Sequence, residues 1–175
     1  MLSKVLVNIG RFLLLIFLQG VLLNDVNLWD GMAIPYLYIL FLLMLPIDIP
    51  RWLELLIGLI AGLSLDMFTN TAGIHASACV LLSFLRPIYL RSIAPRDGYE
   101  FGVKPTINDM GLAWYIKYAA VLIFIHHAWL FYVEIYSLSG FFNTLLRVFL
   151  SSVFTFILVI LSQFLISKKK GSNYL

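Results

Sequence analysis

Six apolar runs separated by short polar segments constrain the fold of this chain more than any other feature of its sequence. A membrane-spanning helix needs about 20 predominantly apolar residues, and five of the six runs approach or exceed that length. The runs are continuously apolar, whereas the strands of a membrane barrel alternate in polarity, so they predict helices. The expected spans are residues 5–23, 34–45, 52–68, 73–90, 112–136 and 141–166.

The second run, residues 34–45, is the exception in length. Its 12 residues would extend about 18 Å as a helix, well short of the ~30 Å hydrocarbon core. Pro35 and Pro46 bracket the run. We therefore expect a short or partly re-entrant helix whose ends are sheltered by the rest of the protein.

Composition supports the same class of protein. Hydrophobic residues make up 62% of the 175-residue chain and charged residues only 12%, whereas a soluble domain is about half apolar and a quarter charged. We predict an all-α integral membrane protein with one transmembrane domain over residues 1–167 and a basic cytoplasmic tail at 168–175. The single Cys79 excludes an internal disulfide, and no motif suggests that the protein binds nucleic acid.

Lysine and arginine residues indicate the orientation of the spans. With six spans, eleven of the 12 Lys and Arg residues fall on one side of the membrane, and only Arg147 lies near the other. Omitting the short second span would scatter these charges over both sides. Because positive residues concentrate on the cytoplasmic side, we expect six spans with both termini in the cytoplasm. The basic region from Arg86 to Lys104 is either a solvated loop or a contact for anionic lipid or cytoplasmic partners.

The third and fourth runs are predicted to form a tight helical hairpin. Gly58, Gly62 and Asp66 recur every four residues and therefore lie on one face of a helix. Two glycines at this spacing allow another helix to approach closely. Asn70 and Gly73 lie in the polar turn that follows. The expected result is a hairpin with a polar apex, around which the other helices pack.

Asp66 is the ionisable residue whose position suggests a role most strongly. Ionisable groups inside a membrane are costly and are candidates for function. We expect a structural role, in which the carboxylate bonds to Asn70, to Thr71 or to the start of the next helix, whose dipole favours a negative charge. No combination of nucleophile, base and orienting residue accompanies it, so no enzymatic activity is expected.

His126 and His127 lie near the middle of the fifth run. They are interpreted as hydrogen-bonded packing residues. A metal site with His75, Asp66 or Cys79 is the alternative, but the chain has no His pair four residues apart and no HExxH motif. A proton relay also stays open.

Two further charged residues lie near the ends of the fifth and sixth runs. Glu134 and Arg147 flank the short turn that connects these runs. We expect the two side chains to form an ion pair across the turn. Such a pair would be structural.

Several of these segments together resemble the rod shape-determining protein MreD family. The resemblance is carried by the hairpin GLIAGLSLDMFTNTAGIHASA, the LRP that follows it and the loop IAPRDGYEFGVKPT. The segments PYLYILFLLMLPIDIPRW, HHAWLFYVE and LLRVFLSS add to it. The similarity extends from Gly10 through the sixth run, and the family motif falls on Gly58, Gly62, Asp66, Gly73 and His75.

The resemblance implies a non-catalytic component of the machinery that inserts peptidoglycan into the lateral cell wall. MreD-like proteins reside in the bacterial inner membrane, bind the bitopic protein MreC, and help to regulate the RodA glycosyltransferase and its penicillin-binding transpeptidase partner. They are also linked to the cytoplasmic MreB filament. The family fold is similar to the S-components of energy-coupling-factor transporters, and no cofactor is implied.

Two hypotheses therefore remain. In the first, the chain is a structural and regulatory subunit whose apolar outer face, with or without the short second helix, binds a single helix of MreC. In the second, it is a small-molecule-binding transport subunit with a sealed outward pocket. That pocket would be lined by Asp66, Asn70 and aromatic residues. The first is preferred because of the family resemblance.

Overall fold

The computed structural model describes residues 2–24, 26, 28, 31–136 and 140–168. Apart from an isolated bridge between Leu28 and Ala33, the regular elements within these ranges are helical. They are α1 (Leu2–Phe17), a π-helical turn η1 (Leu18–Leu23), α2 (Ile39–Leu43), α3 (Arg51–Thr69), α4 (Ile74–Ser92), α5 (Ile107–Met110), α6 (Leu112–Ile135) and α7 (Phe141–Lys168). Most of the expected tail, residues 169–175, lies outside the described residues.

The described part of the chain contains four helices that are long and apolar enough to cross a membrane. They are Leu6–Leu23, Arg51–Thr69, Leu112–Ile135 and Phe141–Leu165. The prediction of an all-α membrane protein is confirmed at this level. Run 73–90 also forms one continuous helix, α4, but α4 is not among the four, and it contains two arginines, Arg86 and Arg91.

The second run differs from the other five, because only Ile39–Leu43 of residues 34–45 is helical. Pro35 has no backbone N–H and disfavours a helical conformation in the residue before it. The backbone N–H groups of Ile34 and Tyr36 instead donate to side-chain hydroxyls of α7. The helix expected across 34–45 is thus reduced to little more than one turn.

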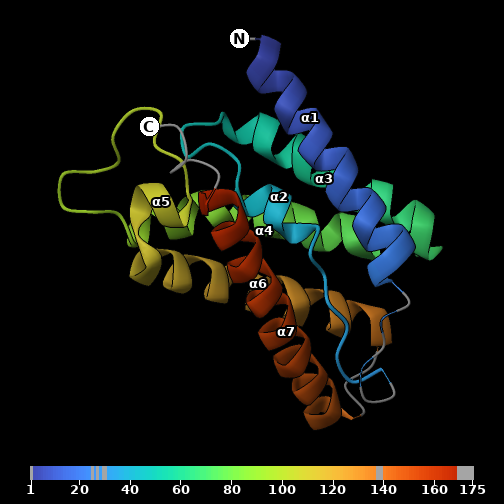
Figure 1. Ribbon diagram of the computed structural model, residues 1–175. Helices are drawn as coiled ribbons and strands as arrows, with labels where there is room; N and C mark the ends of the chain where they lie inside the picture. Colours follow the sequence, from blue (N-terminus) through green and yellow to red (C-terminus); the bar gives the residue numbers. More distant parts are fainter. Residues whose placement is uncertain (1, 25, 27, 29–30, 137–139, 169–175) are drawn as a thin grey trace.

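The hairpin of α3 and α4 forms the most extensive helix contact, and α6 packs against both α4 and α7. In Figure 1, α3, α4 and α6 run across the view, α1 and α7 cross them steeply, and α2 lies in the middle of the molecule. The segment around α2 is therefore interior. Its side chains Ile39, Leu42 and Leu43 are fully buried, so of the two forms of the docking hypothesis the one without the short second helix fits the structure.

Candidate functional site

The apex of the α3–α4 hairpin is organised by Asp66. Its carboxylate oxygens accept hydrogen bonds from the backbone N–H groups of His75 and Ala76, each at 3.0 Å. The Thr71 hydroxyl donates a further hydrogen bond to Oδ1. Asp66 is only 6% exposed, so its charge is compensated by the N-terminus of α4, where unpaired N–H groups and the helix dipole favour an anion. The predicted structural contacts to Thr71 and to the start of the next helix are confirmed.

The turn itself depends on two residues with positive φ. Asn70 ends α3 with φ 53°, and its backbone N–H donates to the Asp66 carbonyl oxygen. Gly73 precedes α4 with φ 83°. Asn and Gly are the residues that adopt this left-handed conformation most readily. Asn70 therefore contributes to the turn at the apex by adopting the left-handed backbone conformation that ends α3.

The two glycines of α3 face α4 at very short range. A methyl group at Gly62 would overlap the backbone of Ala76 and lie 2.6 Å from the His75 carbonyl oxygen. A methyl group at Gly58 would overlap the Ser83 hydroxyl and lie 2.9 Å from the Cys79 carbonyl oxygen. The close approach predicted for this face is confirmed, and the helix that approaches is α4 of the same chain.

Replacing Asp66 by Asn tests the apex directly. The amide keeps the shape of the carboxylate but retains only one acceptor oxygen, so one of the two N–H groups at the start of α4 loses its acceptor. We expect a loss of stability of about 1–3 kcal/mol, the typical cost of a buried unpaired donor. The thermal unfolding midpoint of the purified protein in detergent measures it. An unchanged midpoint would show that the charge contributes nothing to the hairpin.

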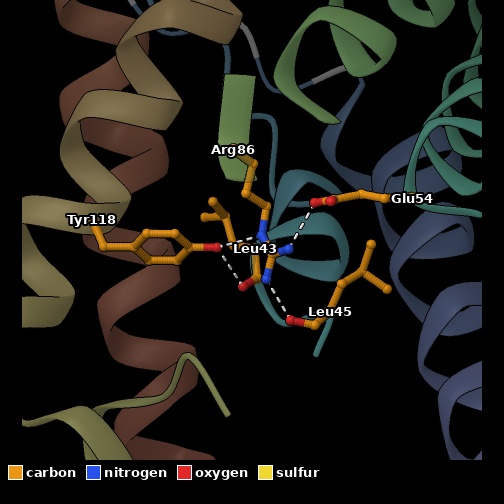
Figure 2. Close-up of polar contacts among 5 residues, drawn as sticks. All are labelled: Leu43, Leu45, Glu54, Arg86 and Tyr118. Atoms are coloured by element: carbon orange, nitrogen blue, oxygen red, sulfur yellow. Dashed lines mark hydrogen bonds and ion pairs between the residues drawn. The ribbon is translucent and has the colours of Figure 1, made fainter. Parts of the chain in front are cut away.

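A second polar centre lies deeper in the molecule around Arg86 (Figure 2). Its guanidinium forms an ion pair with Glu54, with 2.7 Å between Nη1 and Oε1, and both side chains are at most 2% exposed. Nε donates to the Tyr118 hydroxyl at 2.6 Å, and Nη2 donates to the carbonyl oxygen of Leu45. Arg86 is thus buried, and its assignment to the basic loop that would meet lipid or cytoplasmic partners is wrong.

Tyr118 extends this centre toward the interior segment. Its hydroxyl accepts from Arg86 and donates to the Leu43 carbonyl oxygen at 2.9 Å. The carbonyl groups of Leu43 and Leu45, at and just beyond the end of α2, are therefore bound by side chains of α4 and α6. Buried backbone groups without such partners would be costly, particularly at membrane depth.

Polar side chains of η1 and α7 form hydrogen bonds with backbone groups at the start of the segment around α2. The Ser151 hydroxyl accepts from the Ile34 N–H at 3.0 Å, and the Thr155 hydroxyl accepts from the Tyr36 N–H at 2.9 Å. Gln19 of η1 donates to the Pro35 carbonyl oxygen at 2.9 Å. The irregular backbone before and after α2 is thus satisfied by polar residues that interrupt the apolar runs.

His126 belongs to a buried cluster centred on Tyr38. The Tyr38 hydroxyl lies 2.9 Å from Nε2 of His126 and 3.1 Å from Nδ1 of His75. The thiol of Cys79 lies 3.6 Å from the same oxygen. His127 is bonded separately, with Nδ1 2.8 Å from the Ile123 carbonyl oxygen and Nε2 3.1 Å from the Thr155 hydroxyl. Both histidines are therefore buried and hydrogen-bonded, as interpreted from the sequence.

The cluster brings together three of the residues weighed for a metal site. His75, Cys79 and His126 all surround the Tyr38 hydroxyl, which occupies the position between them. Among the residues whose positions the structure describes, no group of three or more His, Cys, Asp and Glu side chains is arranged to hold a metal ion. The hydrogen-bond partner that the three side chains share is the hydroxyl group of Tyr38.

Glu134 and Arg147 form the expected ion pair, with Arg147 Nη1 3.2 Å from Glu134 Oε2. The Arg147 guanidinium also lies over the ring of Phe131, 4.3 Å from its centroid. The side chains are 22% exposed for Arg147 and 40% for Glu134. This pair is therefore partly open, in contrast to the pair of Arg86 and Glu54.

The Glu134–Arg147 pair lines a pocket of about 180 Å³ at one end of the bundle. The pocket collects the residue after η1, the end of α3, the start of α4, the end of α6 and the start of α7. Its lining residues are Asn24, Ile34, Tyr36, Thr69, Thr71, Ile74, His75, Leu130, Glu134 and Arg147. Asp66 and Asn70, which the transport hypothesis placed in such a pocket, are not in this lining.

The fold and these polar centres define a helical membrane protein with an irregular segment buried among its helices. The chain matches no protein-family model, no curated protein and no solved structure. Its class therefore rests on its own sequence and geometry.

Sequence reasoning missed the centre around Arg86, and with it the pairing of Glu54, Tyr118 and the carbonyl groups near α2. One signal was present: Glu54 lies four residues before Gly58, on the face of α3 that packs against α4. A carboxylate on that face requires a buried partner, and α4 contains Arg86 near the expected depth. Tyr36 and Tyr38 had no comparable signal, because tyrosine is common in apolar segments.

Proposed function

We propose that this protein is a non-catalytic membrane subunit of MreD type in the bacterial cell-elongation complex. It binds MreC and supports or regulates lateral peptidoglycan synthesis together with RodA, its penicillin-binding transpeptidase partner and, at the cytoplasmic face, MreB. The proposal extends the family resemblance of the hairpin, the loop after α4 and the last two helices.

The observation that supports the proposal most is that the motif residues all lie at the α3–α4 hairpin and together join its two helices. Gly58 and Gly62 allow α4 to approach closely, Asp66 binds its first backbone N–H groups, and Gly73 is the residue that ends the turn and precedes α4. His75 joins this unit to the core through Tyr38. The residues are engaged within the chain, which fits a role in building a rigid scaffold.

The topology we propose has six passes with both termini in the cytoplasm of the inner membrane. Residues after η1 and at the end of α3 line the same pocket, so the chain between them must return to the far end, where α3 begins. Since α3 has 19 residues, this return covers about 28 Å. This return of the chain supports a second membrane pass by the irregular segment around α2. With α3 as the third pass, α4 is then the fourth.

The outward surface supports docking of a partner helix. Of the four long apolar helices, α1 has the smallest share of residues buried in the molecule. Its exposed side chains include Leu6, Leu13, Leu14 and Phe17. In a membrane such a surface is covered by lipid or by another apolar helix. We place the MreC helix on this face of α1.

The transport-subunit alternative is less well supported. It requires Asp66 as a ligand contact, whereas both of its oxygens bind backbone N–H groups of α4 and one also binds Thr71. The carboxylate is thereby used in joining the two helices. The pocket near Arg147 is the feature that this alternative would have to use.

Copurification tests the proposal. The tagged protein, extracted from its own cells in mild detergent, is expected to retain MreC, with RodA and the transpeptidase as further components. A photoreactive residue placed at Leu13 should crosslink to MreC, whereas one at Phe149 on the exposed face of α7 serves as the matched control. Recovery of an ATPase-bearing coupling module in place of MreC would contradict the proposal.

A further inference from the structure

The pocket at the end of the bundle is lined by one negative and one positive side chain, which form an ion pair with each other. Glu134 and Arg147 line it, together with the hydroxyl-bearing residues Thr69 and Thr71 and with His75. Its volume of about 180 Å³ is close to that of cavities that hold a benzene-sized molecule. It is therefore large enough for a ligand of about six to ten non-hydrogen atoms.

The Arg147 side chain retains hydrogen-bonding capacity after pairing with Glu134. Nη1 is the atom that contacts Glu134, and among the described residues Nε is buried without a hydrogen-bond partner. Buried donors of this kind are normally satisfied. Because Nε is enclosed, the terminal nitrogens are the guanidinium donors that an oxyanion in the pocket can reach, and a guanidinium binds an oxyanion through two parallel hydrogen bonds. The guanidinium also lies over the Phe131 ring, which contributes a cation–π contact.

The Glu134 carboxylate supplies the opposite charge. Its side chain is 40% exposed, and a partly exposed ion pair of this kind contributes only about 0–1 kcal/mol. A ligand with its own charges can therefore separate the pair at little cost. Because the charges of Glu134 and Arg147 cancel, the pocket favours a ligand that also has one charge of each sign.

Three further lining side chains are positioned by hydrogen bonds near these two charges. Thr69 and Thr71 are joined by a 2.8 Å hydrogen bond, and Thr71 is bonded to Asp66. The His75 ring is bonded through Nδ1 to Tyr38, which leaves Nε2 as the nitrogen available to a ligand. A site whose side chains are already positioned loses less entropy on binding.

From this arrangement we infer that the pocket binds a small zwitterion with a primary ammonium group and an oxyanion. The oxyanion binds the terminal guanidinium nitrogens of Arg147, and the ammonium group binds Glu134. Two sources have this chemistry and size: a free amino acid and the phosphoethanolamine headgroup of a lipid. The inference goes beyond the proposed scaffold role and does not depend on MreC.

Thermal unfolding of the full chain in lipid nanodiscs tests the inference. In phosphatidylcholine nanodiscs, whose quaternary headgroup has no N–H donor, each of the twenty common amino acids is added and the midpoint Tm is recorded. In parallel, phosphatidylcholine and phosphatidylethanolamine nanodiscs are compared without added solute. We expect a saturable rise in Tm with an amino acid if the ligand is free, or a higher Tm in phosphatidylethanolamine alone if it is a lipid.

Derivatives and variants identify the site. For an amino acid that binds, its N-acetyl and amide forms each lack one charge and should leave Tm unchanged. Arg147→Gln and Glu134→Gln should weaken binding about ten- to hundredfold, as expected for the loss of a hydrogen bond between charged groups. Arg91→Gln and Glu100→Gln, which alter exposed residues outside the pocket, are the matched controls.

Three results would overturn the inference. The first is a Tm that no amino acid changes and that is equal in the two lipids. The second is equal binding of the zwitterion and its singly charged derivatives. The third is wild-type affinity in folded Arg147→Gln protein, and the derivative comparison decides the matter if that variant does not fold.

Discussion

Replacement of Arg86 by Met is expected to cause the largest loss of stability of any single substitution considered for this protein. Glu54 would remain buried without its partner, and the Leu45 carbonyl oxygen would lose its donor. Removing one partner of a buried ion pair typically costs about 3–5 kcal/mol. Size-exclusion chromatography and thermal unfolding in detergent should therefore show little or no folded Arg86→Met protein.

Arg91→Met is the matched control, because Arg91 is in the last turn of the same helix and exposed. A double variant separates the ion pair from the backbone contact. Adding Glu54→Gln to Arg86→Met removes the unpaired charge and should restore part of the stability, with a coupling energy of about 1–3 kcal/mol. If Arg86→Met unfolds at the wild-type temperature, the guanidinium does not hold the interior segment.

Replacement of Gly62 by Leu is expected to separate α3 from α4. Even a methyl group at this position would overlap the Ala76 backbone, and backbone atoms of a helix cannot move aside as a side chain can. Overpacking of a well-packed interior costs about 1–3 kcal/mol, and occasionally more. Because the Asp66 contacts to α4 lie one turn further along α3, they should be lost as well. We expect a large fall in the unfolding midpoint and loss of copurified MreC.

For the unfolding midpoint, Gly10→Leu provides the control for hydrophobicity and helix propensity, because a Cβ atom at Gly10 meets nothing within 4 Å. It is not a control for MreC retention, because Gly10 lies on the face of α1 that we propose as the MreC site. Gly58→Ala should cost less than Gly62→Ala, since its nearest obstacle is the Ser83 hydroxyl, a side-chain group that can rotate. Wild-type stability and partner retention in Gly62→Leu would show that the two helices do not need their close approach.

The hairpin was predictable because its determinants are local in sequence. Glycines four residues apart, an acid one turn later and a turn with Asn and Gly define which face is narrow, where the helix ends and which helix comes next. The pairing of Glu134 with Arg147 follows from the same kind of information, since a short turn brings the ends of two consecutive helices together.

The polar residues in the other apolar runs were not predictable in the same way. Gln19, Ser151, Thr155 and Tyr118 bind backbone groups of a segment that is distant from each of them in the chain. Periodicity within one helix identifies a face, but it does not identify the backbone carbonyl that the face will meet. Arg86 was misassigned for this reason, because its position near the end of an apolar run also fits a cytoplasmic flank.

The sequence by itself determined the class of this protein, the positions of its long helices and the close packing of α3 on α4. These properties depend on hydrophobicity, helix length and local turns, which act between neighbouring residues. Only the tertiary structure decided that residues 34–45 form an irregular interior segment and that Arg86, Glu54 and Tyr118 surround its end. The physical reason is that a buried backbone group needs a partner, and the helices that supply it come together only when the whole bundle packs.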